Sequence, residues 1–212
     1  MTANPDIGND VHLIFQQLSG LAAPLQLKHL LQSPFTLHAG VLSRIAREAE
    51  HARAGRKARI VAKMNALNEP QVIEALYAAS QAGVDIDLVV RGACTLRPGL
   101  PGVSETIRVR SIVGRFLEHH RVWWFANDGA PDLFCSSADW LERNLLRRVE
   151  TAFPVLDPAA AGRVYREGLA NYLEDNQNAW ELQVDGTYVR RQPRKGEAPF
   201  SAQLALLDDL YA

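Results

Sequence analysis

The segment Gly114–Arg121, with the sequence GRFLEHHR, contains the residues best suited to chemistry on a phosphoryl group. If a strand begins near His119, the two-residue period of a strand places His119 and Arg121 on one face and His120 on the other. An imidazole can act as a nucleophile or a general acid near neutral pH, and a guanidinium beside it can neutralise phosphoryl oxygens. A histidine and an arginine at this spacing also occur in purely structural roles, so both interpretations stay open.

A second candidate segment is Ser136-Ser137-Ala138-Asp139. Its serine hydroxyls, together with the N-terminus of a helix predicted over residues 140–146 with Asp139 as its cap, would supply hydrogen-bond donors for an oxyanion. We expect this segment to lie across a hairpin from His119.

Basic residues near the ends of predicted strands form a third group. Ligands of open α/β sheets bind beyond the carboxyl ends of the strands, and Arg91 stands at such an end, followed by Gly92, which would let a ligand approach the backbone. Lys63 ends the preceding strand, where phosphate binding and an ordinary surface position are both open. Arg108 and Arg110 share one face of the next strand and are expected to line the same crevice.

The elements that would position these residues follow from periodicity and turn signals. Residues 59–64, 69–81 and 84–90 predict a strand, a helix capped by Asn68 and a second strand, which is a βαβ unit with a parallel, buried pair. The fold class is therefore α/β, with a mixed sheet flanked by helices. Residues 1–36 are interrupted by prolines and glycines and predict an irregular lead-in with little core. Further strands are predicted over 107–113, 121–126, 133–137, 149–155, 180–184 and 187–191, and further helices over 37–54, 159–173 and 201–210.

Composition narrows the class of protein. The 212 residues carry 23 Lys and Arg against 24 Asp and Glu, but residues 91–121 have a net charge of +4 and residues 157–185 a net charge of −4. An arginine-only basic cluster favours a phosphate partner, because the guanidinium fork matches an oxyanion. No membrane span and no secretion signal are expected, and the two cysteines, Cys94 and Cys135, predict neither a disulfide framework nor a zinc site.

The strings VRGxCxLxPGxPG and RFLEH, with SSADWLERNLLRRVE, resemble the C-terminal part of the phosphohistidine type of polyphosphate kinase, over essentially residues 6–211. The resemblance implies a fold similar to phospholipase D and reversible transfer of the ATP γ-phosphoryl group to inorganic polyphosphate, with Mg²⁺ as cofactor. Arg91 matches an arginine that contacts the nucleotide phosphates. His119 matches a second active-site histidine that binds ATP phosphates and acts as an acid. His120 stands where the family usually has Ser or Asp.

The family's phosphate-accepting histidine has no counterpart in this chain, so the resemblance implies that it lies upstream. We therefore expect residues 1–36 to be the trailing segment of a preceding catalytic domain and residues 37–212 to be the C-terminal phospholipase D-like domain. His119 is the predicted catalytic residue, and no metal ligand is predicted. The predicted ATP- and phosphate-binding residues are Lys63, Arg91, Arg108, Arg115, His119, Arg121, Ser136, Ser137 and Asp139.

The expected partners are ATP or ADP, inorganic polyphosphate, the upstream domains and a second copy of the full-length enzyme, with no nucleic acid. The expected location is the cytoplasm, including its periphery at the inner face of the membrane. Two other functions stay open. One is a phospholipase D-type phosphodiesterase completed by dimerisation, and the other is a non-catalytic module that binds polyanions. We expect the chain alone to be inactive as a kinase.

Overall fold

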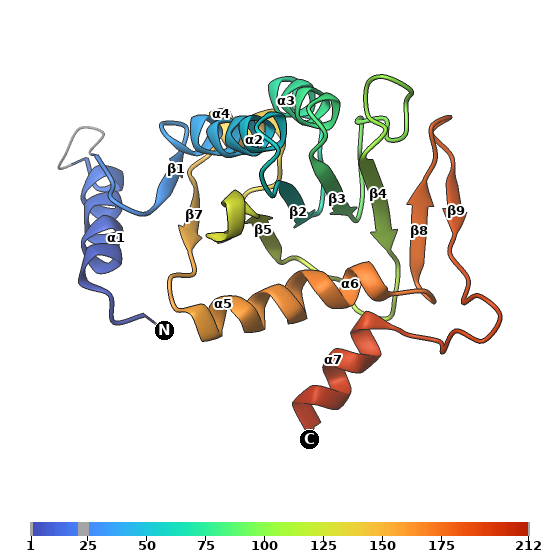
Figure 1. Ribbon diagram of the computed structural model, residues 1–212. Helices are drawn as coiled ribbons and strands as arrows, with labels where there is room; N and C mark the ends of the chain where they lie inside the picture. Colours follow the sequence, from blue (N-terminus) through green and yellow to red (C-terminus); the bar gives the residue numbers. More distant parts are fainter. Residues whose placement is uncertain (1, 21–25, 212) are drawn as a thin grey trace.

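The computed structural model describes residues 2–20 and 26–211 of the chain (Figure 1). Within these ranges nine strands form one mixed sheet in the order β1-β7-β6-β5-β2-β3-β4-β8-β9. Only the β2-β3 and β3-β4 pairs are parallel. The strands are β1 (Leu31–Ser33), β2 (Arg59–Met64), β3 (Asp85–Val90), β4 (Ile107–Ile112), β5 (Arg121–Phe125), β6 (Asp132–Ser136), β7 (Glu150–Pro154), β8 (Ala179–Leu182) and β9 (Tyr188–Arg190).

Helices cover both faces of this sheet (Figure 1). The apolar stripe of α2 (Leu37–Arg53) and that of α3 (Pro70–Gln81) pack against Ile60, Ile86 and Leu88 in the largest core. On the other face, Val61 and Val122 pack against the helical run of α5 (Pro158–Tyr165), the π-helical turn η2 (Arg166–Ala170) and α6 (Asn171–Glu174). The other helical elements are α1 (Pro5–Leu18), the 3₁₀ turn η1 (Asn127–Gly129), α4 (Glu142–Leu146) and α7 (Ala202–Tyr211). The predicted α/β class with a mixed, helix-flanked sheet is confirmed.

The central βαβ unit is the part that the sequence predicts best. β2, α3 and β3 follow one another, and the two strands pair in parallel from Arg59 opposite Asp85 to Met64 opposite Val90. Five of the six residues in each strand are buried, as expected of a parallel pair covered on both faces. The helix cap differs from the prediction, because Glu69 rather than Asn68 accepts a hydrogen bond, at 2.7 Å, from the backbone N–H of Val72.

Over residues 2–20 and 26–36 the chain is not an irregular lead-in, and that expectation was wrong there; residues 1 and 21–25 of the predicted lead-in lie outside the described residues. Asn4 accepts the backbone N–H groups of Asp6 and Ile7 and starts α1, which the sequence punctuation had hidden. Further along the chain, the three-residue strand β1 pairs with β7 and extends the sheet. The core of this part is small, with Ile7 and Ile14 packed on Leu30. The division of the chain at residue 37 remains a prediction.

The helix expected over residues 140–146 is shorter than predicted, and Asp139 does not cap it. α4 begins only at Glu142, and its preceding residue, Leu141, makes no side-chain capping bond. The reason is that the Asp139 carboxylate is used elsewhere, by Asn65 and Arg121. None of the helices in the described ranges has the length and apolarity needed to cross a membrane.

Candidate phosphate-binding site

Four of the predicted site segments meet at one edge of the sheet. The carboxyl ends of β2 and β3 lie there, because these strands are parallel. β5 runs antiparallel to β2, with Val122 opposite Lys63, so that its first residue, Arg121, lies at the same edge. Ser136, the last residue of β6, pairs with Arg121. The topology of the sheet therefore brings together residues that are more than 70 positions apart, as Lys63 and Ser136 are.

Asp139 joins these segments. Its carboxylate accepts hydrogen bonds from the backbone N–H and the side-chain amide of Asn65, at 2.7 and 3.1 Å, and from Nε and an Nη of Arg121, each at 3.1 Å. Burial alone would raise the pKa of the Asp139 carboxyl, but the bonds from Arg121 and Asn65 outweigh it and hold this pKa below its usual value. Asp139 is therefore a charged anchor that fixes Arg121, and Arg121 is not a free cation.

Lys63 is also paired rather than free. Its Nζ lies 2.7 Å from a carboxylate oxygen of Glu118 and 4.5 Å from the centre of the Tyr172 ring, and the side chain is only 3% exposed. Burial lowers the pKa of Lys63, Glu118 opposes this shift, and the nearby charges of Arg91 and Arg121 add to it. Three cations thus lie close together at this edge. The Lys63–Glu118 pair connects β2 to the loop that carries His119.

Arg91 differs from the other two cations. Its Nε is buried and has no hydrogen-bond partner, and in the part of the chain that the structure describes no carboxylate lies within ion-pair distance of it. Gly92 allows the backbone to pass close to Asn65, because a Cβ at this position would meet the carbonyl oxygen of Asn65 at 3.1 Å. A buried guanidinium donor without a partner is the feature that a phosphate oxygen would satisfy.

His119 and His120 lie on opposite sides of the chain, as the strand period predicts. The side chain of His119 is exposed, and its carbonyl oxygen accepts a hydrogen bond from Arg121 at 2.7 Å. His120 turns inward, with Nε2 3.2 Å from the carbonyl oxygen of Gly168 and its ring 5.2 Å from that of Tyr172. Burial lowers the pKa of His120 to about 4. Of the two histidines, only His119 is accessible to a ligand.

The two serines hold the backbone together at this edge. The hydroxyl of Ser136 donates to the carbonyl oxygen of Thr151 at 2.9 Å, and the hydroxyl of Ser137 donates to the carboxylate of Glu150. A hydroxyl has one proton, so both donors are already used within the protein. The arrangement expected from the sequence, with two free hydroxyls followed directly by a helix N-terminus, is therefore not present.

Arg108 and Arg115 are apart from this group. Arg108 is level with Asp87 in β3, whereas Arg91 would be level with the end of β4, about 13 Å away at ~3.3 Å per residue. Its guanidinium pairs with Asp85 at 2.6 Å and with Asp87 at 2.8 Å. It does not line a crevice with Arg91. Arg115 is exposed in the loop before His119, over the ring of Phe116.

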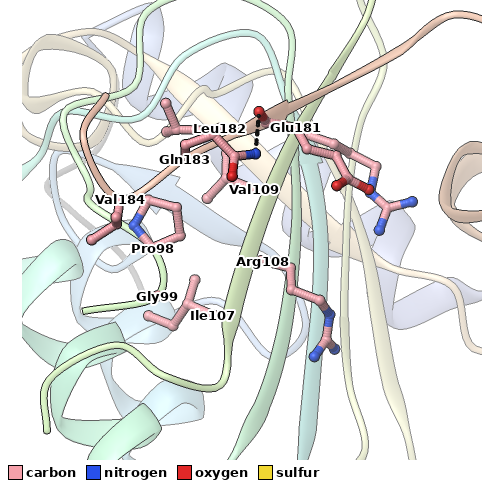
Figure 2. Close-up of a pocket in the computed structure, with 10 residues that line it drawn as sticks. Pro98, Gly99, Ile107, Arg108, Val109, Glu181, Leu182, Gln183 and Val184 are labelled. Carbon is pink, nitrogen blue, oxygen red and sulfur yellow. Dashed lines mark hydrogen bonds between the residues drawn. The ribbon is translucent and has the colours of Figure 1, made fainter. Parts of the chain in front are cut away.

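Figure 2 shows Arg108 at the wall of a pocket between β4 and β8, with a volume of about 350 Å³. Its lining is mixed, with Ile107 and Val109 beside Glu181 and Gln183, and the side-chain amide of Gln183 donates to the carbonyl oxygen of Glu181 at 3.0 Å. The loop residues Pro98 and Gly99, which precede β4, close one side. The pocket therefore lies toward the amino end of β4, away from His119.

Two residues of the site were missed from the sequence. Glu118 is part of the RFLEH string, so its position beside His119 was a signal that could have been used. Gln203, which binds the same loop from α7, gives no signal, because 84 positions separate it from His119. Burial raises the pKa of the Cys94 thiol to about 11 and also raises that of Cys135, which disfavours the thiolate form of both.

The described residues contain no group of three or more His, Cys, Asp and Glu side chains arranged to hold a metal ion.

Fold and site together define an α/β protein in which, among the described residues, an arginine without a carboxylate partner and an exposed histidine lie at the same end of the central strands. The chain belongs to the polyphosphate kinase family, because residues 30–203 match the model of polyphosphate kinase C-terminal domain 2. It is 69% identical over 210 residues to the polyphosphate kinase of Xylella fastidiosa strain 9a5c and 58% identical over 207 residues to that of Burkholderia multivorans. These matches cover 99% and 98% of the chain but only 30% of each relative.

A solved structure gives the same result. The crystal structure of polyphosphate kinase from Porphyromonas gingivalis is 40% identical, with a TM-score of 0.95, over 100% of this chain and 32% of that one. The phospholipase D family member Nuc from Salmonella typhimurium is 20% identical over 65% of the chain, with a TM-score of 0.46. That second likeness is too weak to establish a shared fold, so the phospholipase D part of the expectation rests on the family resemblance.

Proposed function

We propose that this chain is the ATP- and polyphosphate-binding C-terminal part of a polyphosphate kinase. In the reaction, the bond between the γ-phosphorus of ATP and its bridging oxygen breaks and a bond to a histidine nitrogen forms. That phosphohistidine then transfers the phosphoryl group to the terminal oxygen of polyphosphate. The accepting histidine lies outside this chain. The role of the present residues is to hold the anion and to supply a proton at the leaving oxygen.

The observation that carries this proposal is Arg91. Its buried Nε has no partner, and its charge is not balanced by a carboxylate among the described residues. Burying a donor without an acceptor costs about 1–3 kcal/mol, so a bound phosphate oxygen would remove a penalty that the free protein carries. His119, exposed at the same edge, is the group that we assign as the acid.

The other partners follow from this assignment. Mg²⁺ is proposed to arrive with ATP as part of the substrate. We infer that the remaining domains of the enzyme, a second copy of the full-length protein and a cytoplasmic location, including the inner face of the membrane, complete the system. Nucleic acid is not a proposed partner.

The first test is Arg91→Ala in the full-length polypeptide that contains this chain. Loss of a charge-assisted hydrogen bond of about 1.5–3 kcal/mol should reduce kcat/KM for ATP roughly 10- to 100-fold. The matched control is Arg53→Ala, which removes an exposed arginine from the end of α2. Equal activity of the two variants would contradict the proposal.

The second test is His119→Ala in the same full-length protein, with the chain alone assayed in parallel. We expect the variant to lose polyphosphate synthesis by about 100-fold or more, as for removal of a general acid. The isolated chain should make no polyphosphate. Normal synthesis by the variant, or robust synthesis by the isolated chain, would refute these roles. Phosphodiester hydrolysis by a dimer of the chain would favour the phosphodiesterase instead.

A further inference from the structure

The side chain of Gln203, in the first turn of α7, binds both backbone polar groups of Phe116, in the loop formed by residues 113–120. Its Oε1 accepts the backbone N–H of Phe116 at 2.9 Å, and its Nε2 donates to the carbonyl oxygen of the same residue at 2.9 Å. The Nε2 also lies 2.6 Å from a carboxylate oxygen of Glu118. One carboxamide thus makes three hydrogen bonds to a segment 87 positions earlier in the chain.

The contact is close and specific. Gln203 is only 6% exposed, and a Cβ at Gly114 would collide with its Oε1. A side chain at position 114 would therefore displace the Gln203 carboxamide from its present position. By contrast, Val113 and Leu117 are 61% and 74% exposed, so apolar packing does little to fix this loop. Its position depends on polar contacts.

Glu118 receives a second support from the opposite direction. While one of its carboxylate oxygens accepts from Gln203, the other pairs with Nζ of Lys63 in β2 at 2.7 Å. The residue that precedes His119 is thus held between α7 and the central sheet. Figure 1 shows α7 at the end of the sheet where β4 ends, which is where this loop begins.

We propose that Gln203 is a positioning residue for His119. It does not contact the substrate; it restricts the loop of residues 113–120 to the conformation in which the exposed imidazole faces the edge that carries Arg91. This inference rests on the proposed function, because the position of His119 matters only if His119 acts as the acid. It also assigns α7 a role in the site, since displacement of α7 would release the loop.

The test compares Gln203→Glu and Gln203→Ala in the full-length protein. Glutamate keeps the shape of the Gln203 side chain but replaces its amide donor with a carboxylate oxygen. That oxygen is repelled by the two acceptors that the amide binds, the Glu118 carboxylate and the Phe116 carbonyl oxygen. We expect kcat to fall about tenfold at pH 7.5 while KM for ATP changes less than twofold, because Arg91 is untouched. As the pH is lowered toward 5.5, protonation of the new carboxyl restores a donor, so the ratio of variant to wild-type kcat should rise. The alanine variant should show no such recovery.

The matched control is Gln81→Glu, the same isosteric change at the end of α3, where the amide donates to the carbonyl oxygen of Gly102 at 2.9 Å. Its kcat should stay within twofold of wild type at both pH values. A structural readout accompanies the kinetics, namely hydrogen exchange of the Phe116 amide. That amide should exchange faster in Gln203→Ala, while the amides of β2 and β3 stay protected.

The outcomes separate this inference from the proposed function. If His119→Ala is inactive but Gln203→Ala loses Phe116 protection and keeps full kcat, the positioning role is wrong and the function stands. Unchanged Phe116 exchange in Gln203→Ala would also overturn it. If His119→Ala is fully active, the function fails, whatever Gln203 does. Should the alanine variant not fold, the pH recovery of Gln203→Glu decides, and its absence counts against the inference.

Discussion

His119 and His120 are neighbours with opposite environments. In the extended segment just before β5, successive side chains point to opposite sides, so that one imidazole faces solvent and the other lies under the η2–α6 segment. Burial, together with the charge of Lys63, lowers the pKa of His120 to about 4, so this histidine is neutral near pH 7. A neutral imidazole, hydrogen-bonded to the carbonyl oxygen of Gly168, therefore occupies position 120.

The depressed pKa of His120 predicts a loss of stability in acid. In the unfolded chain His120 takes up a proton below about pH 6.5, whereas in the folded protein it does so only near pH 4. The free energy of unfolding therefore falls as the pH decreases between these two values. The difference of roughly 2.5 pKa units corresponds to about 3 kcal/mol at the lower end.

Urea unfolding between pH 4.5 and 7 measures this effect. His120→Asn should flatten the curve of unfolding free energy against pH relative to wild type. His12→Asn, at an exposed position of α1, should leave the curve unchanged. Parallel curves for wild type and His120→Asn would show that His120 is not responsible.

At the scale of elements, the site exists because strands of different direction end at one edge. β2 and β3 finish there, β5 starts there, and the segment after β6 folds back over it through Asp139. The sequence predicted each of these strands, but it predicted Asp139 as a helix cap, whereas the Asp139 carboxylate binds Arg121 and Asn65. A helix-capping pattern and an aspartate that binds an arginine look alike locally.

Replacing Asp139 should therefore damage more than one element. In Asp139→Ala the guanidinium of Arg121 and the backbone N–H of Asn65 lose their acceptor, and breaking such a buried pair costs about 3–5 kcal/mol. Asp208→Ala, at an exposed position of α7, should cost less than about 0.5 kcal/mol. Equilibrium urea unfolding compares the two, and equal midpoints would show that Asp139 is not an anchor.

Across the whole molecule, most of the +4 net charge of residues 91–121 is neutralised by nearby carboxylates. Arg108 pairs with Asp85 and Asp87, Arg110 lies 4.0 Å from Asp87, and Arg121 pairs with Asp139. The guanidinium of Arg97, in the loop before β4, donates at 3.2 Å to the carbonyl oxygen of Val184, which lines the pocket between β4 and β8. Arg91 and Arg115 remain as the cations of this segment that can face a polyanion there.

This pairing predicts a weak salt dependence of polyphosphate binding by the chain. At about −0.7 per phosphate contact, two contacts give a slope of roughly −1.4 for log K against log salt concentration. Arg91→Ala should reduce its magnitude by ~0.7, while Arg108→Ala should leave it unchanged. Titration at several salt concentrations measures the slope. A slope near −4, or a reduction on removing Arg108, would show that the paired arginines also bind the anion.

The sequence by itself determined the local part of this protein. The βαβ unit, the later strands and the opposite faces of His119 and His120 follow from periodicity, because side-chain alternation and turn chemistry act over a few residues. The motif strings gave the family. The helix α1 was not predicted, because its prolines and glycines are typical of irregular chain; its N-cap, Asn4, lies just before Pro5.

Only the tertiary structure decided which charges are free. Lys63, Arg108 and Arg121 look equivalent to Arg91 in the sequence, and each is neutralised by a carboxylate brought close by strand order. Gln203 reaches the His119 loop for the same reason, since α7 packs against the end of the sheet. Ion pairs and hydrogen bonds depend on distances of a few ångströms between positions far apart in the chain, and the order of strands in the sheet sets those distances.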